Sequence, residues 1–173
     1  MKCRNGFVSN SSSSSFVVAF KKVPNTKKEL QNMLFENVPL YPHPYGNMDN
    51  CPDNYPTSEV TETVWQDMCG DGKSKPQSVT MDELSETFSN GHLEGSPDYD
   101  DFKKSGDDYE IDWDALHEAQ DKFATQKRDE FVANNPDCEF FTFSYGDDDG
   151  EYGCALEHGD LFDRLPHQRI SCH

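Results

Sequence analysis

The residues best suited to chemistry lie in the last 17 positions of the sequence. Glu157 and His158 are adjacent there, His167 follows nine residues later, and the chain ends on His173. Carboxylate and imidazole groups are ligands that zinc and other transition metals accept. No two of these residues have the short spacing typical of a structural zinc site, so zinc or another divalent metal at His158, His167 and His173 is an alternative hypothesis. The main prediction is that the protein needs no cofactor.

A run of five serines, residues 11–15, lies between apolar segments instead of in a polar linker. Consecutive hydroxyl and backbone N–H groups can bind phosphate, but such loops usually contain glycine and lead into a helix. This run leads into a strand-like segment, and the chain has no GxSxG motif for a serine nucleophile. We therefore expect mainly small packed side chains. If a site forms, we expect it where the two ends of the chain meet, at Ser9, Asn10, Ser11, Ser12, Ser13, Glu157, His158 and His167.

The net charge of −18 is unevenly distributed along the chain. Residues 1–45 carry +4, residues 46–121 carry −16, and residues 122–173 carry −6. A negative field repels phosphates, which argues against direct nucleic-acid binding, and it attracts a partner with a basic surface. We expect an exposed acidic segment at residues 96–111. Its interaction surface is expected to consist of Asp98, Asp100, Asp101, Asp107, Asp108 and Glu110.

The length of 173 residues predicts one domain, residues 1–173, which buries about 70% of the surface that its unfolded chain exposes. The apolar fraction is 34%, so the 12 phenylalanines and seven tyrosines must supply much of the core. Six cysteines are scattered without a CxxC pair, no leader pattern is visible, and no apolar stretch approaches the roughly 20 residues of a membrane span. These features predict a cytoplasmic protein with reduced thiols and no membrane association.

Two patterns predict strands. Residues 16–20 form a nearly continuous apolar run, which is typical of a strand that is buried on both faces and has a partner on each side. Residues 138–145 and 151–158 flank a Gly-Asp-Asp-Asp-Gly turn, which predicts a β-hairpin. A last short strand is expected at residues 169–172. The stretch 39–57, rich in proline and tyrosine, is expected to be an irregular loop.

Helices are predicted from caps and from apolar spacing. Thr26 and Thr80 are each followed three residues later by glutamate, the capping-box pattern, and Asp112 can cap a longer helix. A short helix is expected from the spacing of Val60, Val64 and Met68. The buried faces of the last two helices are expected to comprise Met81, Leu84, Phe88, Trp113, Leu116, Ala119, Phe123 and Phe131. The predicted fold is α+β: a small, mainly antiparallel sheet of the N-terminal strand and the C-terminal hairpin, covered by three to four helices.

The two ends of the chain carry a resemblance. The opening Gly-Phe-Val-Ser-Asn followed by five serines and Phe16 resembles a group of small uncharacterised proteins from bacteriophages and bacteria that begin with a similar GFVSNSSSSSF segment. The closing Glu157-His158-Gly159 and the segment 165–171 are similar to the tail of some of them. This resemblance covers roughly the first 20 and the last 35 residues. It implies a phage or phage-like source and a domain in which both ends fold together, but no known activity.

Three functions are compatible with these observations. The first is a non-enzymatic viral accessory protein in the host cytoplasm, which binds a basic surface of a host or viral protein and modulates host machinery. The second is a small metal- or nucleotide-dependent enzyme with its site between the serine run and the C-terminal histidines. The third is a structural component of the virion.

Overall fold

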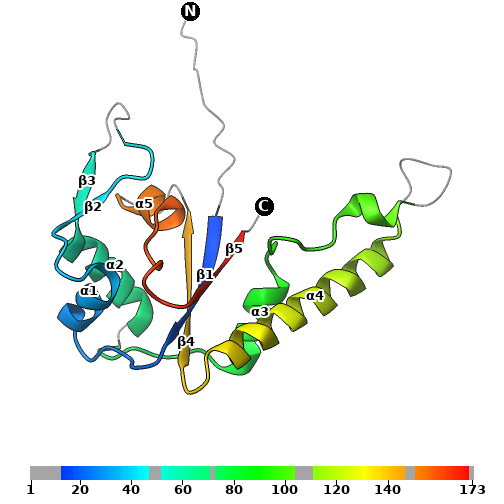
Figure 1. Ribbon diagram of the computed structural model, residues 1–173, viewed down its shortest axis with the longest axis horizontal. Coiled ribbons are helices and arrows are strands. Elements are labelled where there is room, and N and C mark those ends of the chain that lie inside the picture. The colour runs from blue at the N-terminus through cyan, green and yellow to red at the C-terminus, as the bar shows by residue number, and fades with distance from the viewer. Residues whose placement is uncertain (1–12, 47–51, 71–72, 104–110, 147–150, 172–173) are drawn as a thin grey trace, which may run out of the picture.

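The computed structural model describes residues 13–46, 52–70, 73–103, 111–146 and 151–171, and its centre is a three-stranded antiparallel sheet (Figure 1). The strands β1 (Ser13–Phe20), β4 (Glu139–Gly146) and β5 (His167–Ser171) have the order β4-β1-β5. In the β1–β4 register Ser13 lies opposite Gly146, and in the β1–β5 register Val18 lies opposite His167. The prediction of a central N-terminal strand with a partner on each side is confirmed.

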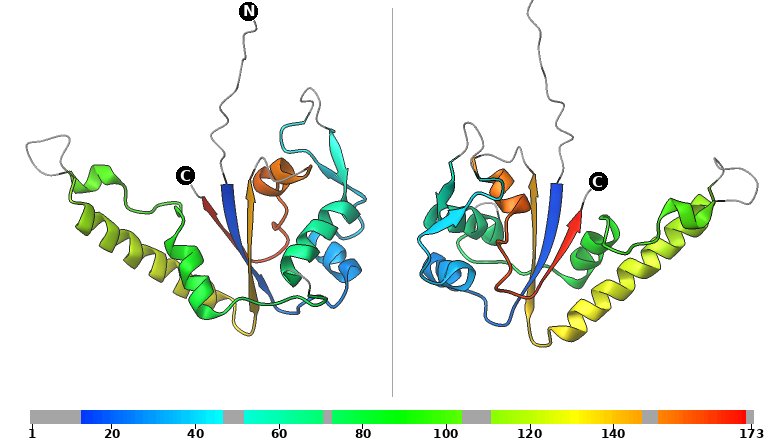
Figure 2. Two further views of the ribbon diagram at one scale, coloured as in Figure 1. Left: turned by 180° about the vertical axis from the view of Figure 1, so that it is seen from behind. Right: turned by 45° about the horizontal axis from the view of Figure 1, so that its top comes forward.

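Helices cover both faces of this sheet, which makes the protein α+β as predicted. One face carries Phe16, Val18 and Phe20 of β1, and it packs against α1 (Lys27–Phe35), α2 (Thr57–Cys69) and α5 (Gly153–His158). The opposite face carries Val17, which packs with Ile170 against α3 (Met81–Ser89) and the C-terminal part of α4 (Trp113–Asn134). The two groups of helices lie on opposite sides of the sheet in Figure 2. Alternate side chains of β1 thus belong to two separate apolar clusters, one on each face of the sheet.

Three of the helices begin directly after the residues that were predicted to cap them. The Thr26 hydroxyl accepts from the Glu29 backbone N–H at 3.2 Å, and the Asp112 carboxylate accepts from the Ala115 N–H at 3.1 Å. At Thr80 the capping box is complete, since the Glu83 carboxylate also accepts from the Thr80 backbone N–H at 2.8 Å. The carboxylate of Glu29 accepts from the backbone N–H of Asn25 at 2.7 Å, one residue before the cap. These bonds satisfy N–H groups that have no partner within the helix.

The predicted C-terminal hairpin is wrong in its second arm. The segment 153–158 is the helix α5, in which Ala155 and Leu156 are buried against the sheet. The second partner of β1 is β5, which begins two residues before the strand expected at 169–172. A returning hairpin arm would have paired with β4, whereas this segment forms a helix that packs on the sheet. The Asp-Asp-Asp-Gly part of the expected turn, residues 147–150, lies outside the described residues.

The expected irregular loop at 39–57 contains a small sheet. Strands β2 (Leu40–Pro42) and β3 (Asn54–Pro56) pair antiparallel, with Tyr41 opposite Tyr55. Both tyrosine side chains are buried in the larger apolar cluster, and burial of two aromatic rings outweighs the strand-breaking tendency of the nearby prolines. The short helix expected from Val60, Val64 and Met68 is confirmed as α2, and all three residues are buried.

Two residues of the expected buried faces are exposed. Met81 is 49% exposed because it stands at the first position of α3, whereas Leu84 and Phe88 are buried as predicted. Trp113 is 54% exposed because α4 runs past the sheet, so that its N-terminal end has no sheet beneath it (Figure 1). Leu116 is buried, and the remaining predicted positions on α4 are partly buried: Ala119, Phe123 and Phe131. Within the described residues no helix has the length and apolarity to cross a bilayer.

The different surroundings of Leu84 and Met81 lead to a matched prediction. Leu84→Ala should lower the free energy of unfolding by roughly 2–5 kcal/mol, because it leaves a cavity in the cluster beneath α3. Met81→Ala on the same helix should change it by less than about 0.5 kcal/mol. Urea denaturation followed by circular dichroism at 222 nm measures both values. Similar losses for the two variants would contradict the described orientation of α3.

Candidate functional site

The structure describes only some residues of the expected site between the serine run and the C-terminal histidines. Ser13 begins β1 opposite Gly146, whereas His167 begins β5 opposite Val18, five residues further along β1. At about 3.3 Å per residue this offset corresponds to roughly 17 Å, so the sheet does not bring Ser13 and His167 together. Ser9, Asn10, Ser11, Ser12 and the metal candidate His173 lie outside the described residues.

Glu157 and His158 do form an unusual local arrangement on α5. The Glu157 side chain is 1% exposed, and neither carboxyl oxygen has a hydrogen-bond partner among the described residues. The nearest cationic candidate is His158, whose Nε2 lies 3.5 Å from Oε2 of Glu157. A buried carboxylate normally makes several hydrogen bonds or a close ion pair, because its desolvation is costly. Glu157 therefore stands out as the least satisfied charged group among the described residues.

Aromatic residues that follow β2 lie beside this pair. The ring of Tyr45 lies 5.3 Å from that of His158 and 6.2 Å from that of His43, measured between centroids. The backbone N–H of Tyr45 donates to Nδ1 of His43 at 3.2 Å, so a neutral His43 carries its proton on Nε2, which is buried and has no partner. We call Tyr41, His43, Tyr45, Glu157 and His158 the tyrosine–histidine cluster.

Tyr41 contacts Gly159, the residue that follows α5. Its buried hydroxyl has no hydrogen-bond partner and lies directly against Gly159, where an added Cβ would collide with it and would lie 2.5 Å from the carbonyl oxygen of Ala155. Burial raises the pKa of the Tyr41 phenol, and the negative charges of Asp160 and Asp163 raise it further. Tyr41 therefore stays a neutral hydroxyl in a negatively charged environment.

The histidines do not converge on a shared centre. Nδ1 of His167 lies 3.1 Å from the carbonyl oxygen of Leu165, and its Nε2 lies 4.0 Å from Asp163, whereas His158 faces Glu157. Among the residues that the structure describes, no three His, Cys, Asp or Glu side chains are placed to hold a metal ion. The described residues thus offer no complete ligand set for the zinc alternative.

The acidic segment forms a projecting arm. The 3-10 helix η1 (Tyr99–Phe102) packs on the outer end of α4, where the backbone N–H of Asp112 donates to the carbonyl of Phe102 at 3.0 Å and Gln120 donates to the carbonyl of Pro97 at 3.1 Å. In Figures 1 and 2 this end of α4 is the part furthest from the sheet. We call residues 94–103 and 111–121 the acidic arm.

The surface of the acidic arm combines carboxylates with two exposed aromatic rings. Its exposed acids are Glu94, Asp98, Asp100, Asp101, Asp112, Asp114, Glu118 and Asp121. Lys103, the one described lysine of the arm, is ion-paired with Asp100 at 2.6 Å and lies over the Tyr99 ring. Trp113 and Tyr99 are each more than half exposed. The predicted exposure of Asp98, Asp100 and Asp101 is confirmed, whereas Asp107, Asp108 and Glu110 lie outside the described residues.

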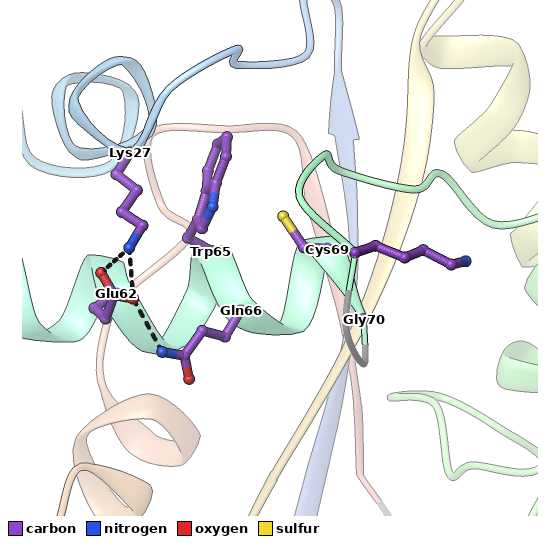
Figure 3. A pocket seen from close by; sticks show the side chains of 7 residues that line it. Lys27, Glu62, Trp65, Gln66, Cys69 and Gly70 are labelled. Atoms are coloured by element: carbon purple, nitrogen blue, oxygen red, sulfur yellow. Dashed lines mark hydrogen bonds and ion pairs between the residues drawn. The ribbon is translucent and has the colours of Figure 1, made fainter.

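A third feature is a surface pocket of about 390 Å³ between α1 and α2 (Figure 3). Lys27 and Gln66 both donate to the Glu62 carboxylate, at 2.6 and 2.9 Å from Oε1, so these polar groups already satisfy one another. Burial raises the pKa of the neighbouring Cys69 thiol, which keeps it protonated and a poor nucleophile. Among the described residues that line the pocket, Cys69 is thus not an activated nucleophile.

Comparisons with protein-family models, with curated proteins and with solved structures found no match to this chain. Two features remain as candidates for function: the tyrosine–histidine cluster and the acidic arm. The sequence pointed to the arm through its charge and to Glu157 and His158 through their residue types. It missed Tyr41, His43 and Tyr45, although their alternation with Pro42 and Pro44 is the pattern of an extended segment that places alternate side chains on one side.

The contact between Tyr41 and Gly159 leads to a stability prediction. Gly159→Ala should cost about 1–3 kcal/mol of folding free energy, because the new methyl group overlaps the Tyr41 hydroxyl and the Ala155 carbonyl. Tyr41→Phe alone should change stability little, since the hydroxyl it removes has no partner. Thermal unfolding of the single variants and of the double variant tests the contact, and the double variant should recover part of the loss. Wild-type stability of Gly159→Ala would contradict this packing.

Proposed function

We propose that this protein acts by binding a partner protein, with the acidic arm as its contact surface and a basic region of a host or viral protein as its target. The resemblance at the two chain ends supports a phage or phage-like source, and therefore an accessory role that modulates host machinery in the host cytoplasm. No catalytic step belongs to this proposal. Direct contact with nucleic acid is disfavoured by the net charge of −18.

The observation that carries the proposal is the pairing of exposed aromatic rings with surrounding carboxylates on the arm. Aromatic anchors, above all tryptophan and tyrosine, supply much of the binding energy in protein interfaces, and surrounding charges steer the encounter and select the partner. Trp113 is 54% exposed among the described residues, and the ring of His117 lies 6.1 Å from its ring. Exposure of such a large ring is costly in isolation, and burial against a partner would recover that cost.

The long helix α4 suits this role. Its C-terminal part packs on the sheet and on α3, where Ala124 is buried in the second apolar cluster, so the outer part has a rigid base. A basic groove or concave surface on a partner can then receive the arm without unfolding it. The enzyme alternative gains no specific support, because β1 and β5 separate Ser13 from His167.

The charge contribution is tested by neutralising three arm carboxylates. Asp98→Asn, Asp100→Asn and Asp101→Asn together should weaken partner capture from host lysate by roughly tenfold at low salt, and wild-type capture should itself fall steeply as salt rises. Quantitative mass spectrometry of the captured proteins at low and high salt measures both effects.

The control for this experiment carries the same change in net charge on exposed acids elsewhere: Asp82→Asn, Asp137→Asn and Glu139→Gln. A genuine partner is retained by this control and by the wild type, and is lost from the arm variant. Equal loss from both variants would mean that only net charge matters, and capture that does not respond to salt would contradict the electrostatic proposal.

The aromatic contribution is tested by Trp113→Ala. We expect at least about a tenfold loss of affinity for the captured partner, because an anchor tryptophan in an interface typically contributes 2 kcal/mol or more. Since the ring is 54% exposed, the free energy of unfolding should change by less than about 1 kcal/mol. Isothermal titration and urea denaturation separate the two quantities. Unchanged affinity would exclude Trp113 from the interface.

A further inference from the structure

The tyrosine–histidine cluster contains a buried carboxyl group whose oxygens have no hydrogen-bond partner among the described residues. Glu157 is 1% exposed, both of its oxygens lack hydrogen-bond partners in the part of the chain that the structure describes, and its contact with His158 is long at 3.5 Å. Removing a carboxylate from water without pairing it costs several kcal/mol. Such a cost is recovered when a ligand brings the missing positive charge and N–H donors to the carboxylate.

The surroundings add to the negative potential. Asp160 and Asp163 follow α5 directly and act electrostatically on Tyr41, which belongs to the same cluster. Oδ1 of Asp163 lies 4.0 Å from Nε2 of His167. The nearby Arg164 is engaged by Glu36 and is not paired with the cluster. The local field therefore favours a cation.

The walls of the cluster are aromatic. The Tyr45 ring contacts the rings of His43 and His158, and the His43 ring lies 5.7 Å from that of Tyr55. A cation held near tyrosine faces is stabilised by their negative electrostatic potential, most strongly where water is excluded. The Tyr41 hydroxyl, which has no partner, can accept one further N–H donor.

These features suit an organic cation better than a metal ion. A zinc site requires three or four protein ligands in close geometry, and the described residues contain no group of three that could form one. An ammonium or guanidinium group needs one carboxylate, additional hydrogen-bond acceptors and an apolar wall. The cluster supplies the Glu157 carboxyl group, the Tyr41 hydroxyl as an acceptor, and the Tyr45 ring as a wall.

We propose that the tyrosine–histidine cluster binds an organic cation, a primary ammonium or a guanidinium group, with Glu157 as its counter-ion. The cation enters past Tyr45, which is 53% exposed, and past His158, which is partly exposed. The group can belong to a free small amine or to a lysine or arginine side chain of a peptide. This site is separate from the acidic arm and does not depend on the arm's proposed role.

The test is a titration of the full chain followed by NMR signals of the His43 and His158 rings. The probes are n-propylammonium, n-propylguanidinium and the capped tripeptides Gly-Lys-Gly and Gly-Arg-Gly, with 1-butanol and sodium chloride as neutral and ionic controls. A saturable shift with the free cations but not the controls is expected. Response to the tripeptides as well identifies a side-chain site, and response to the free cations alone identifies a small-molecule site.

Glu157→Gln is the decisive variant, because glutamine keeps the shape of the side chain and removes its charge. Its affinity for the cations should fall at least tenfold, whereas Glu151→Gln, which removes an exposed charge close to α5, should keep wild-type affinity. Tyr45→Ala should weaken binding and leave the fold intact because the ring is half exposed, so it tests the site even if Glu157→Gln is unstable.

Several outcomes would overturn the proposal. A Glu157→Gln variant that responds like the wild type excludes Glu157 as the counter-ion. If Glu157 is solvated only by tightly held water, none of the cations gives a saturable shift. Binding of zinc chloride without a response to the organic cations assigns the site to a metal. Glu157→Gln should also leave partner capture by the acidic arm unchanged, so failure here is distinguishable from failure of the proposed function.

Discussion

The structure depends on the complete enclosure of one strand. β1 is hydrogen-bonded along both edges, by β4 and β5, and helices cover both of its faces, so that Val17 and Val18 are both fully buried. Neighbouring side chains of a strand point to opposite faces, and β1 therefore needs two apolar layers. A chain with 34% apolar residues can build two layers only by using aromatic rings densely, which explains the contacts among Phe16, Phe143 and Phe162.

The central strand and the helix starts could be predicted because their signals are local. The apolar run at residues 16–20, the threonine caps and Asp112 each specify backbone hydrogen bonds within a few residues. The partner of a strand edge is decided by distant segments, and for this reason the hairpin prediction failed. Residues 153–158 had strand-like neighbours, yet Ala155 and Leu156 are buried on one side of a short helix that packs on the finished sheet.

The two candidate sites differ in the same way: the acidic arm was partly predictable from the sequence, and the tyrosine–histidine cluster was not. Charge is additive along the sequence, so the acidic segment and the exposure of Asp98, Asp100 and Asp101 were predictable. Burial is not additive, and nothing near Glu157 in the sequence indicates that its side chain is only 1% exposed. The alternation of Tyr41, His43 and Tyr45 was visible, but its proximity to α5 depends on the Tyr41–Gly159 contact, which joins positions more than 100 residues apart.

The antiparallel pairing of Ser14 with Ser171 has a consequence for the connectivity of the chain. β1 begins and β5 ends at the same end of the sheet, as Figure 1 shows, so the beginning and the end of the described fold are neighbours. A short link between these two ends would therefore close the chain into a ring. The same sheet could be built by a circularly permuted chain, in which β5 leads directly into β1 and new ends are opened in an exposed connection. It could equally be inserted into a loop of another protein, because its two attachment points are close together.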